Sequence, residues 1–123
     1  MPIQSINPAT GEILHTYEEL SAEVVESKIQ AAHATFLTWR KVSFEQRATL
    51  MKAAAVHIRI HKDTYARTMT LEMGKPITES LAEMEKCALV CDYYAENAAE
   101  FLKDQPRESD ATRSYVRFAP MGV

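Results

Sequence analysis

The spacing of apolar side chains predicts an amphipathic helix between Ser21 and Arg40. Apolar residues recur there at intervals of four, three, four and three positions, the period of a helix with one apolar face. The members of this stripe are Val25, Ile29, Ala32, Phe36 and Trp39. Ser21 stands at the N-cap position and Glu23 in the first turn, where a carboxylate meets the positive end of the helix dipole.

Two further helices follow. One is predicted to open at Ser43, because Gln46 comes three residues later and the two side chains can satisfy each other's backbone donors. Its apolar positions are Met51, Ala54, Ala55 and Ile58. The next begins near Asp63 and ends at Gly74, whose missing Cβ permits a left-handed C-terminal residue. We expect its inward-facing residues to be Ala66, Met69 and Met73.

The longest helix is predicted to begin with Pro76 in its first turn, where the missing N–H of proline costs nothing. Its apolar positions alternate at four and three residues without a break, and so regular a stripe needs a partner surface. The stripe consists of Ile77, Leu81, Met84, Ala88, Cys91, Ala95, Ala98 and Leu102.

Extended segments are predicted at both ends of the chain. Ile3–Ile6 and Ile13–Tyr17 flank a turn that contains Pro8 and Gly11, a combination typical of a β-hairpin. After a polar linker, residues Arg113–Phe118 alternate between two faces, the period of a strand. Since unpaired strand edges are avoided in finished domains, we expect the partner of this strand to lie beyond Val123.

Composition excludes several classes of protein. The chain has 123 residues, 46% of them hydrophobic, and a formal net charge of -3, enough for about one ordinary domain. The charge balance does not favour a nucleic-acid or anionic-membrane partner. No apolar run approaches the roughly 18 residues of a membrane span, and the first residues lack the pattern of a signal peptide. We therefore expect a cytoplasmic protein that contacts neither nucleic acid nor membrane.

The two cysteines are predicted to be structural. Cys87 and Cys91 lie four apart in a helical pattern, a geometry that disfavours an ordinary disulfide. No histidine or helix N-terminus stands beside either residue in the sequence to lower the thiol pKa. Reduced, buried thiols are the preferred interpretation, and no residue of the chain is assigned a catalytic role.

Neither a metal site nor a cofactor site is expected. His57 and His61 are spaced like half of a zinc site, but Ile58 stands where a catalytic glutamate would follow His57, and no third ligand is nearby in the sequence. A solvated helix end is the preferred interpretation. The chain has 3 glycines, too scattered for a phosphate-binding loop, so the chain alone is expected to bind no nicotinamide cofactor.

Two sequence blocks resemble the aldehyde dehydrogenase superfamily: Glu72-Met73-Gly74-Lys75-Pro76 and Cys91-Asp92-Tyr93-Tyr94-Ala95-Glu96. The segments Ile6–Glu12, Phe36–Trp39 and Ala119–Val123 stand in the order that this superfamily shows at its N-terminal quarter. In detail the chain is most similar to bacterial succinate-semialdehyde dehydrogenases, which use NAD or NADP. The implied fold class is mainly α with an N-terminal β-hairpin and a C-terminal strand, the N-terminal part of the α/β aldehyde dehydrogenase fold.

The resemblance also implies an activity whose chemistry lies outside these residues. The full-length enzyme would bind NAD or NADP on a Rossmann-type domain, trap the aldehyde on a cysteine, transfer hydride and hydrolyse the thioester with a glutamate-activated water. Residues 1–106 would be the hairpin and helical layer of the incomplete cofactor-binding domain, and residues 107–123 the first strand of a truncated oligomerisation arm. The implied partners are the remainder of the chain and further copies in a homo-oligomer.

Lys86 is the one candidate site residue. By resemblance, its helix borders the passage through which the aldehyde enters, so this lysine could attract a substrate that carries a carboxylate. The alternative is an ordinary solvated lysine whose stem lies on apolar surface. For the whole chain, the alternative function is a self-contained helical interaction module that pairs through the Ile77 to Leu102 stripe, although Ala88, Ala95 and Ala98 make a poor coiled-coil seam.

Overall fold

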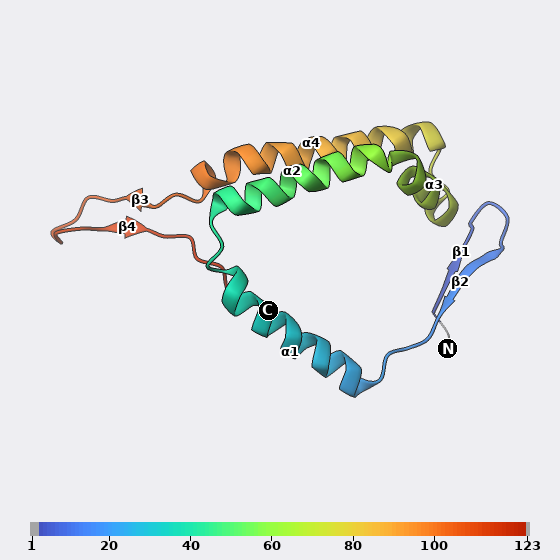
Figure 1. Cartoon of the computed structure of the whole chain (residues 1–123), viewed down its shortest axis with the longest axis horizontal. Coiled ribbons are helices and arrows are strands. Elements are labelled where there is room, and N and C mark those ends of the chain that lie inside the picture. The colour runs from blue at the N-terminus through green and yellow to red at the C-terminus, as the bar shows by residue number, and fades with distance from the viewer. Residues whose placement is uncertain (1–2, 123) are drawn as a thin grey trace.

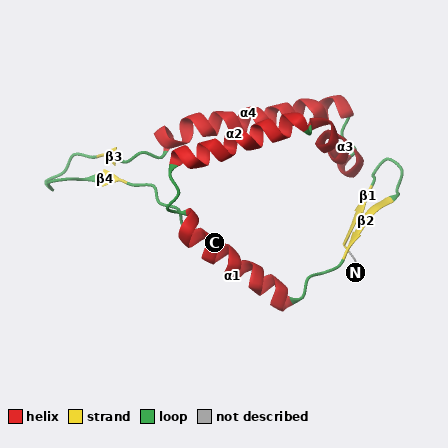
Figure 2. Cartoon of the chain, in the orientation of Figure 1, coloured by secondary structure: helices red, strands yellow, loops and turns green. Residues whose placement is uncertain are grey.

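The computed structural model, which describes residues 3–122, is an open frame of helices with a β-hairpin at one corner and a thin arm at another (Figure 1). Along the chain the elements are β1 (Ile3–Ile6), β2 (Ile13–Tyr17), α1 (Ala22–Trp39), α2 (Phe44–Ile60), α3 (Lys62–Met73), α4 (Ile77–Phe101), β3 (Gln105–Pro106) and β4 (Tyr115–Val116). The expectation of a mainly helical chain with a hairpin at its start is confirmed (Figure 2).

The predicted N-terminal hairpin forms with the expected bounds. β1 and β2 pair in antiparallel fashion from Ile3 opposite Tyr17 to Ile6 opposite Ile13. Asn7 is buried and closes the turn, because its side-chain Oδ1 accepts from the Ala9 N–H and its backbone carbonyl accepts from the Gly11 N–H. Gly11 adopts a φ of 76°, a left-handed conformation that favours glycine.

Helix caps lie where the sequence places them. The Ser21 hydroxyl accepts from the Val24 N–H, and Ser43 forms with Gln46 the reciprocal capping box expected for α2. Gly74 ends α3 in the left-handed conformation, with φ 72°. Pro76 departs from the prediction by one position. Its ψ of 135° is extended, so it is the N-cap and α4 begins at Ile77.

The core is formed by small residues where α2 and α3 pack against α4. Ala55 of α2, Ala66 of α3 and Ala88 of α4 have no exposed surface. Ser80 is equally buried, and its hydroxyl makes a 3.1 Å hydrogen bond with the Thr70 hydroxyl. Side chains this small let helix backbones approach closely, and the buried hydroxyl keeps a partner, as burial requires.

One expectation about an inward-facing residue is wrong. Met73 is 70% exposed, because it lies in the last turn of α3, where the chain leaves through Gly74 before α4 begins. Among the apolar positions of α2, Ala54 is exposed beside the buried Ala55, whereas Met51 and Ile58 are half-buried. The α2 face that meets α4 is therefore narrower than its apolar stripe.

Charged side chains join α2 to α4 beside this core. Arg59 of α2 donates from Nε to Glu85 at 3.0 Å and pairs through Nη2 with Asp92 at 2.8 Å. The hydrogen bond to Glu85, followed by that to Asp92, raises the pKa of Arg59 above its ordinary value. One guanidinium thus fixes the register of two helices through carboxylates two turns apart.

The motif around Gly74 fastens the hairpin to the helices. Ser5 of β1 donates its hydroxyl to Glu72 Oε1 at 2.7 Å. A Cβ at Gly74 would lie 3.0 Å from the Pro8 side chain, so the ring of Pro8 lies directly against the glycine. Lys75 forms an ion pair with Glu83 of α4. The first sequence block therefore has a structural function, the joining of hairpin, α3 and α4.

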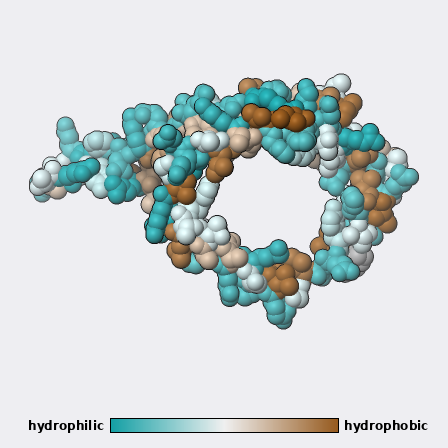
Figure 3. Space-filling model, viewed as in Figure 1, coloured by the Kyte–Doolittle hydropathy of each residue, from teal (hydrophilic) through white to brown (hydrophobic). Residues whose placement is uncertain are grey.

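Helix α1 stands apart from the other helices and buries none of its residues. Its stripe remains open, with Val25 43%, Ile29 50% and Trp39 44% exposed. Figure 3 shows the frame in space-filling form, with an open centre between α1 and the α2–α4 pair. Gly122 approaches α1 closely, since a Cβ there would lie 2.7 Å from the Phe36 ring. The apolar stripe of α1 is typical of a helix in a protein core, but here it is exposed.

The C-terminal strand differs from its prediction. β4 covers only Tyr115–Val116, shorter than the expected Arg113–Phe118, and it already has a partner within the chain. Gln105 and Pro106 form β3 and pair with Val116 and Tyr115. The residues taken for a linker are the bend of this second hairpin. The signal was missed because a two-residue strand that ends in proline has no visible alternation.

Gly74 and Gly11 provide a matched pair for measuring the hairpin attachment. Gly11→Ala should lower the free energy of unfolding by about 1 to 2 kcal/mol, the cost of a left-handed alanine, because nothing lies within 4 Å of its Cβ. Gly74→Ala should cost about 1 kcal/mol more, because Pro8 must also move. Urea unfolding of both variants is the measurement. Equal losses would mean that Pro8 does not rest on Gly74.

The arm contains an ion pair, between Arg117 and Asp104, whose stabilising effect depends on pH. Arg117 donates from Nε and Nη2 to the Asp104 carboxylate at 3.1 and 2.7 Å, and this hydrogen bonding lowers the pKa of Asp104. Because the folded-state pKa is depressed, the contact stabilises the arm above the unfolded-state pKa and is lost as pH falls through the folded-state value. Carboxyl NMR should place the Asp104 midpoint below that of an unpaired aspartate, and Arg117→Gln should restore it. An unchanged midpoint in that variant would contradict the pairing.

Candidate functional site

Lys86 lies on the side of α4 that faces away from α2. The buried stripe of α4 includes Ala88 and the half-buried Met84, Cys91 and Ala95, whereas Lys86 is exposed. Helical spacing puts Val90, Tyr93 and Phe101 on the same side as Lys86. Together these four residues are called the outer strip of α4.

The outer strip is apolar apart from its lysine. Val90 is 44%, Tyr93 53% and Phe101 47% exposed, and the Tyr93 and Phe101 rings contact each other with centroids 5.9 Å apart. α4 therefore packs one side against α2 and on the opposite side exposes these apolar residues among polar ones, Glu79, Asn97 and Glu100. Apolar side chains on both sides of a helix are typical of a buried position in a larger protein.

The acidic neighbours of Lys86 are occupied by other cations. Glu83 pairs with Lys75, and Glu85 pairs with Arg59. Within residues 3–122, Lys86 itself has no hydrogen bond or ion pair. Its charge is consequently not offset by these two carboxylates and is available to an anion that approaches the outer strip. The structure places Lys86 where either interpretation from the sequence is possible, and its role stays a prediction.

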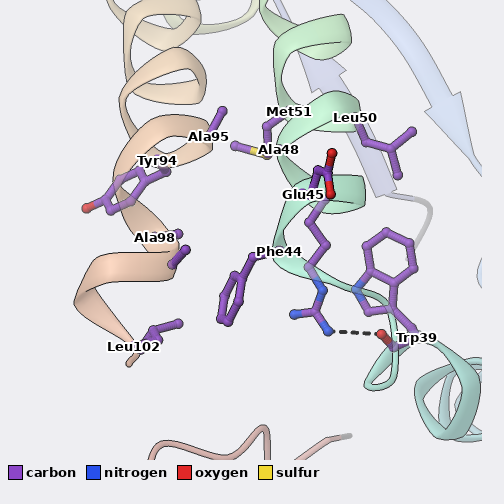
Figure 4. Close-up of a pocket in the computed structure, with 12 residues that line it drawn as sticks. Trp39, Phe44, Glu45, Ala48, Leu50, Met51, Tyr94, Ala95, Ala98 and Leu102 are labelled. Atoms are coloured by element: carbon purple, nitrogen blue, oxygen red, sulfur yellow. Dashed lines mark hydrogen bonds between the residues drawn. The ribbon is translucent and has the colours of Figure 1, made fainter. Parts of the chain in front are cut away.

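A hollow of about 580 Å³ opens between the start of α2 and the end of α4 (Figure 4). Its walls are mostly aromatic and aliphatic, and its lining residues are Trp39, Phe44, Glu45, Arg47, Ala48, Leu50, Met51, Tyr94, Ala95, Ala98, Ala99 and Leu102. Arg47 stacks over the rings of Trp39 and Phe44, with distances of 5.6 and 5.9 Å to their centroids, and donates to the Trp39 carbonyl at 2.9 Å.

The hollow offers packing surface rather than reactive groups. Glu45 is its only carboxylate, Arg47 its only cation, and no cysteine, histidine or serine is among the lining residues that the structure describes. General acid-base or nucleophilic catalysis needs such groups within hydrogen-bond reach of each other. Sequence reasoning did not single out this hollow, although Phe36-Leu37-Thr38-Trp39 belongs to the quoted segments.

The cysteines are free thiols, as predicted. Both are half-buried within this chain, and the burial of Cys91 in the full-length protein stays a prediction. No catalytic assignment follows from either thiol.

His57 and His61 lie side by side where α2 meets α3, with ring centroids 4.3 Å apart. The spatial arrangement adds a residue that the sequence reasoning did not consider, since the Tyr65 hydroxyl lies 2.9 Å from His57 Nε2. Within residues 3–122 there is no group of three or more His, Cys, Asp or Glu side chains able to hold a metal ion. Over the same residues, no helix is long and apolar enough to cross a membrane.

Comparison with known proteins gives a consistent result. The model of the aldehyde dehydrogenase family matches residues 1–123. A probable NADP⁺ succinate-semialdehyde dehydrogenase of Synechocystis sp. is 42% identical over 123 residues, which are 100% of this chain and 27% of that protein. An NADP⁺ succinate-semialdehyde dehydrogenase of Mycobacterium bovis is also 42% identical, over 100% of this chain and 28% of its own length.

A solved structure agrees. The succinic semialdehyde dehydrogenase of Streptococcus pyogenes, crystallised with NADP⁺, superposes with a TM-score of 0.84 and 37% identity over 91% of this chain and 25% of that one. The chain therefore spans about a quarter of the length of the relatives that it matches. The fold expected from the two sequence blocks is confirmed.

Proposed function

The chain belongs to the aldehyde dehydrogenase family, and on that premise we propose that it forms the N-terminal part of an enzyme that oxidises succinate semialdehyde to succinate with NADP as the hydride acceptor. The observation that supports this most is the 42% identity, over 100% of the chain, to NADP⁺ succinate-semialdehyde dehydrogenases. The alternative of a self-contained interaction module loses its support, because the α4 stripe through which it would pair with a partner helix already packs against α2 within this chain.

The proposed partners are the remainder of the enzyme and further copies of it. The open stripe of α1 and the outer strip of α4 supply apolar surface for the rest of the chain, on the cofactor-binding domain. Residues 107–123 are proposed to begin the arm through which subunits associate. We also propose a cytoplasmic location, which the two free thiols favour.

These residues do not form the cofactor site. A nicotinamide dinucleotide needs backbone donors from a glycine-rich turn at a helix start. Gly11 lies in the hairpin, Gly74 at the C-terminus of α3 and Gly122 in the final segment. Since none of them opens a helix among the described residues, cofactor binding and the chemical steps are assigned to the rest of the enzyme.

Turnover by the full-length enzyme tests the central proposal. With succinate semialdehyde and NADP, the absorbance of reduced cofactor should rise, and kcat/KM should exceed that for butanal because the substrate carboxylate adds binding energy. The test includes NAD as the alternative acceptor. Absence of turnover with both cofactors would remove the proposed activity while leaving the family assignment intact.

Lys86→Met tests the role of the lysine on the outer strip. The substitution keeps an unbranched apolar side chain and removes the charge, so KM for succinate semialdehyde should rise by about two- to fivefold, or about 0.5 to 1 kcal/mol. KM for butanal should stay constant. Lys28→Met on α1, another exposed lysine, is the matched control. Equal changes for both aldehydes, or none, would assign Lys86 to ordinary solvated surface.

Calorimetric titration of the isolated 123-residue chain with NAD and NADP tests the assignment of the cofactor site. We expect no saturable binding, because the phosphate-binding turn is not among these residues. Dissociation constants in the micromolar range for either nucleotide would contradict this assignment.

A further inference from the structure

We propose that His57, His61 and Tyr65 form a surface site for a divalent late transition metal, with Cu²⁺ as the preferred ion. The three residues follow one another at intervals of four across the junction of α2 and α3. His57 belongs to the last turn of α2, His61 is at once the C-cap of α2 and the N-cap of α3, and Tyr65 stands in the first turn of α3. Their rings gather on one side of the junction.

The separation of one pair of donor atoms, which now share a hydrogen bond, and that of one pair of rings match those of ligands at right angles on one metal. Two ligands bound at about 2.0 to 2.1 Å and at right angles lie about 2.9 Å apart, and His57 Nε2 lies 2.9 Å from the Tyr65 hydroxyl oxygen. Two imidazoles on one metal at right angles have ring centroids about 4.4 Å apart by the same geometry. The centroids of His57 and His61 are 4.3 Å apart.

The ligand angle of about 90° that these two separations would give on one metal favours one class of ion. Zinc in protein sites is almost always tetrahedral, which would hold two imidazoles farther apart than these. Tetragonal sites of nitrogen and oxygen ligands favour Cu²⁺ or Ni²⁺, and Cu²⁺ binds such ligands most tightly among the divalent first-row metals. Within residues 3–122, both histidines are exposed and Tyr65 is 38% exposed, so no described element blocks the approach of an ion.

Local charge does not oppose the ion strongly. Arg59 lies between the histidines in sequence but turns toward Glu85 and Asp92 of α4, which offset its charge. Lys62 is exposed beside the junction and can extend into water. Because one metal would join the end of α2 to the start of α3, its binding should also stiffen the junction between these helices.

The test is titration of the full-length protein that contains this chain with CuCl₂, followed by calorimetry and by electron paramagnetic resonance. His57→Gln and His61→Gln should each raise the Kd for one equivalent of Cu²⁺ by at least about tenfold, and the spectrum should lose one nitrogen ligand. His33→Gln on α1, an exposed histidine outside the cluster, should change neither. An unchanged Kd in both cluster variants would overturn the proposal.

Tyr65→Phe tests whether the Tyr65 oxygen binds the metal or instead competes with the metal for His57. If the phenol oxygen binds the metal, this variant should weaken Cu²⁺ binding severalfold and remove a phenolate-to-copper absorption band. If Tyr65 only holds His57 through a hydrogen bond, the variant should bind Cu²⁺ more tightly, which would overturn the three-donor site. Zn²⁺ should bind more weakly than Cu²⁺ throughout, and a reversed preference would overturn the assignment of the ion.

Discussion

The close approach of α2 and α3 to α4 is the constraint on which the rest of the frame depends. Ala55, Ala66 and Ala88 have no exposed surface, and side chains of this size stabilise a contact mainly by letting two backbones come near. The ion pairs of Arg59 then fix the register of α2 on α4. Any larger residue at these alanines would separate the helices and move both the hairpin and Lys86.

Because its core consists of such small residues, the chain buries little apolar surface, and many of its larger apolar side chains stay exposed. Three of the largest apolar side chains, Trp39, Tyr93 and Phe101, are between 44% and 53% exposed. In a self-sufficient domain they would supply most of the hydrophobic stabilisation. Here they lie on the stripe of α1 and the outer strip of α4, where the proposed remainder of the enzyme would cover them.

Function is distributed in the same way. The described residues position apolar surfaces, one unpaired cation and the contact between hairpin and helices, while the groups that activate an aldehyde and bind a dinucleotide are proposed to lie in the remainder of the enzyme. Lys86 shows that nearby opposite charges in the sequence need not form ion pairs with a residue in the folded chain. Its neighbours Glu83 and Glu85 each form an ion pair with another cation. The charge of Lys86 is therefore not neutralised by them, although the surrounding sequence is acidic.

The helices, both N-caps and the left-handed Gly74 could be predicted from the sequence, because each rests on contacts within a few residues. The N-terminal hairpin followed for the same reason, from alternation around a turn with proline and glycine. The family, too, could be recognised from two short blocks, although the physical role of the first block in joining Ser5 and Pro8 to the helices could not.

Only the tertiary structure decided which apolar residues are covered. Met73 and Ala54 fit the helical period but are exposed, and Pro106 pairs with Tyr115 across a bend that local pattern does not specify. The contact between Tyr65 and His57 depends on the angle between α2 and α3. Among the described residues Lys86 lacks an ion pair because its neighbouring carboxylates pair with other cations; Glu85, for example, pairs with Arg59, 26 positions away. The period of the sequence determines which side of a helix is apolar. Which of those apolar side chains are buried, and which polar groups form pairs, depends on the positions of elements that are distant in the sequence.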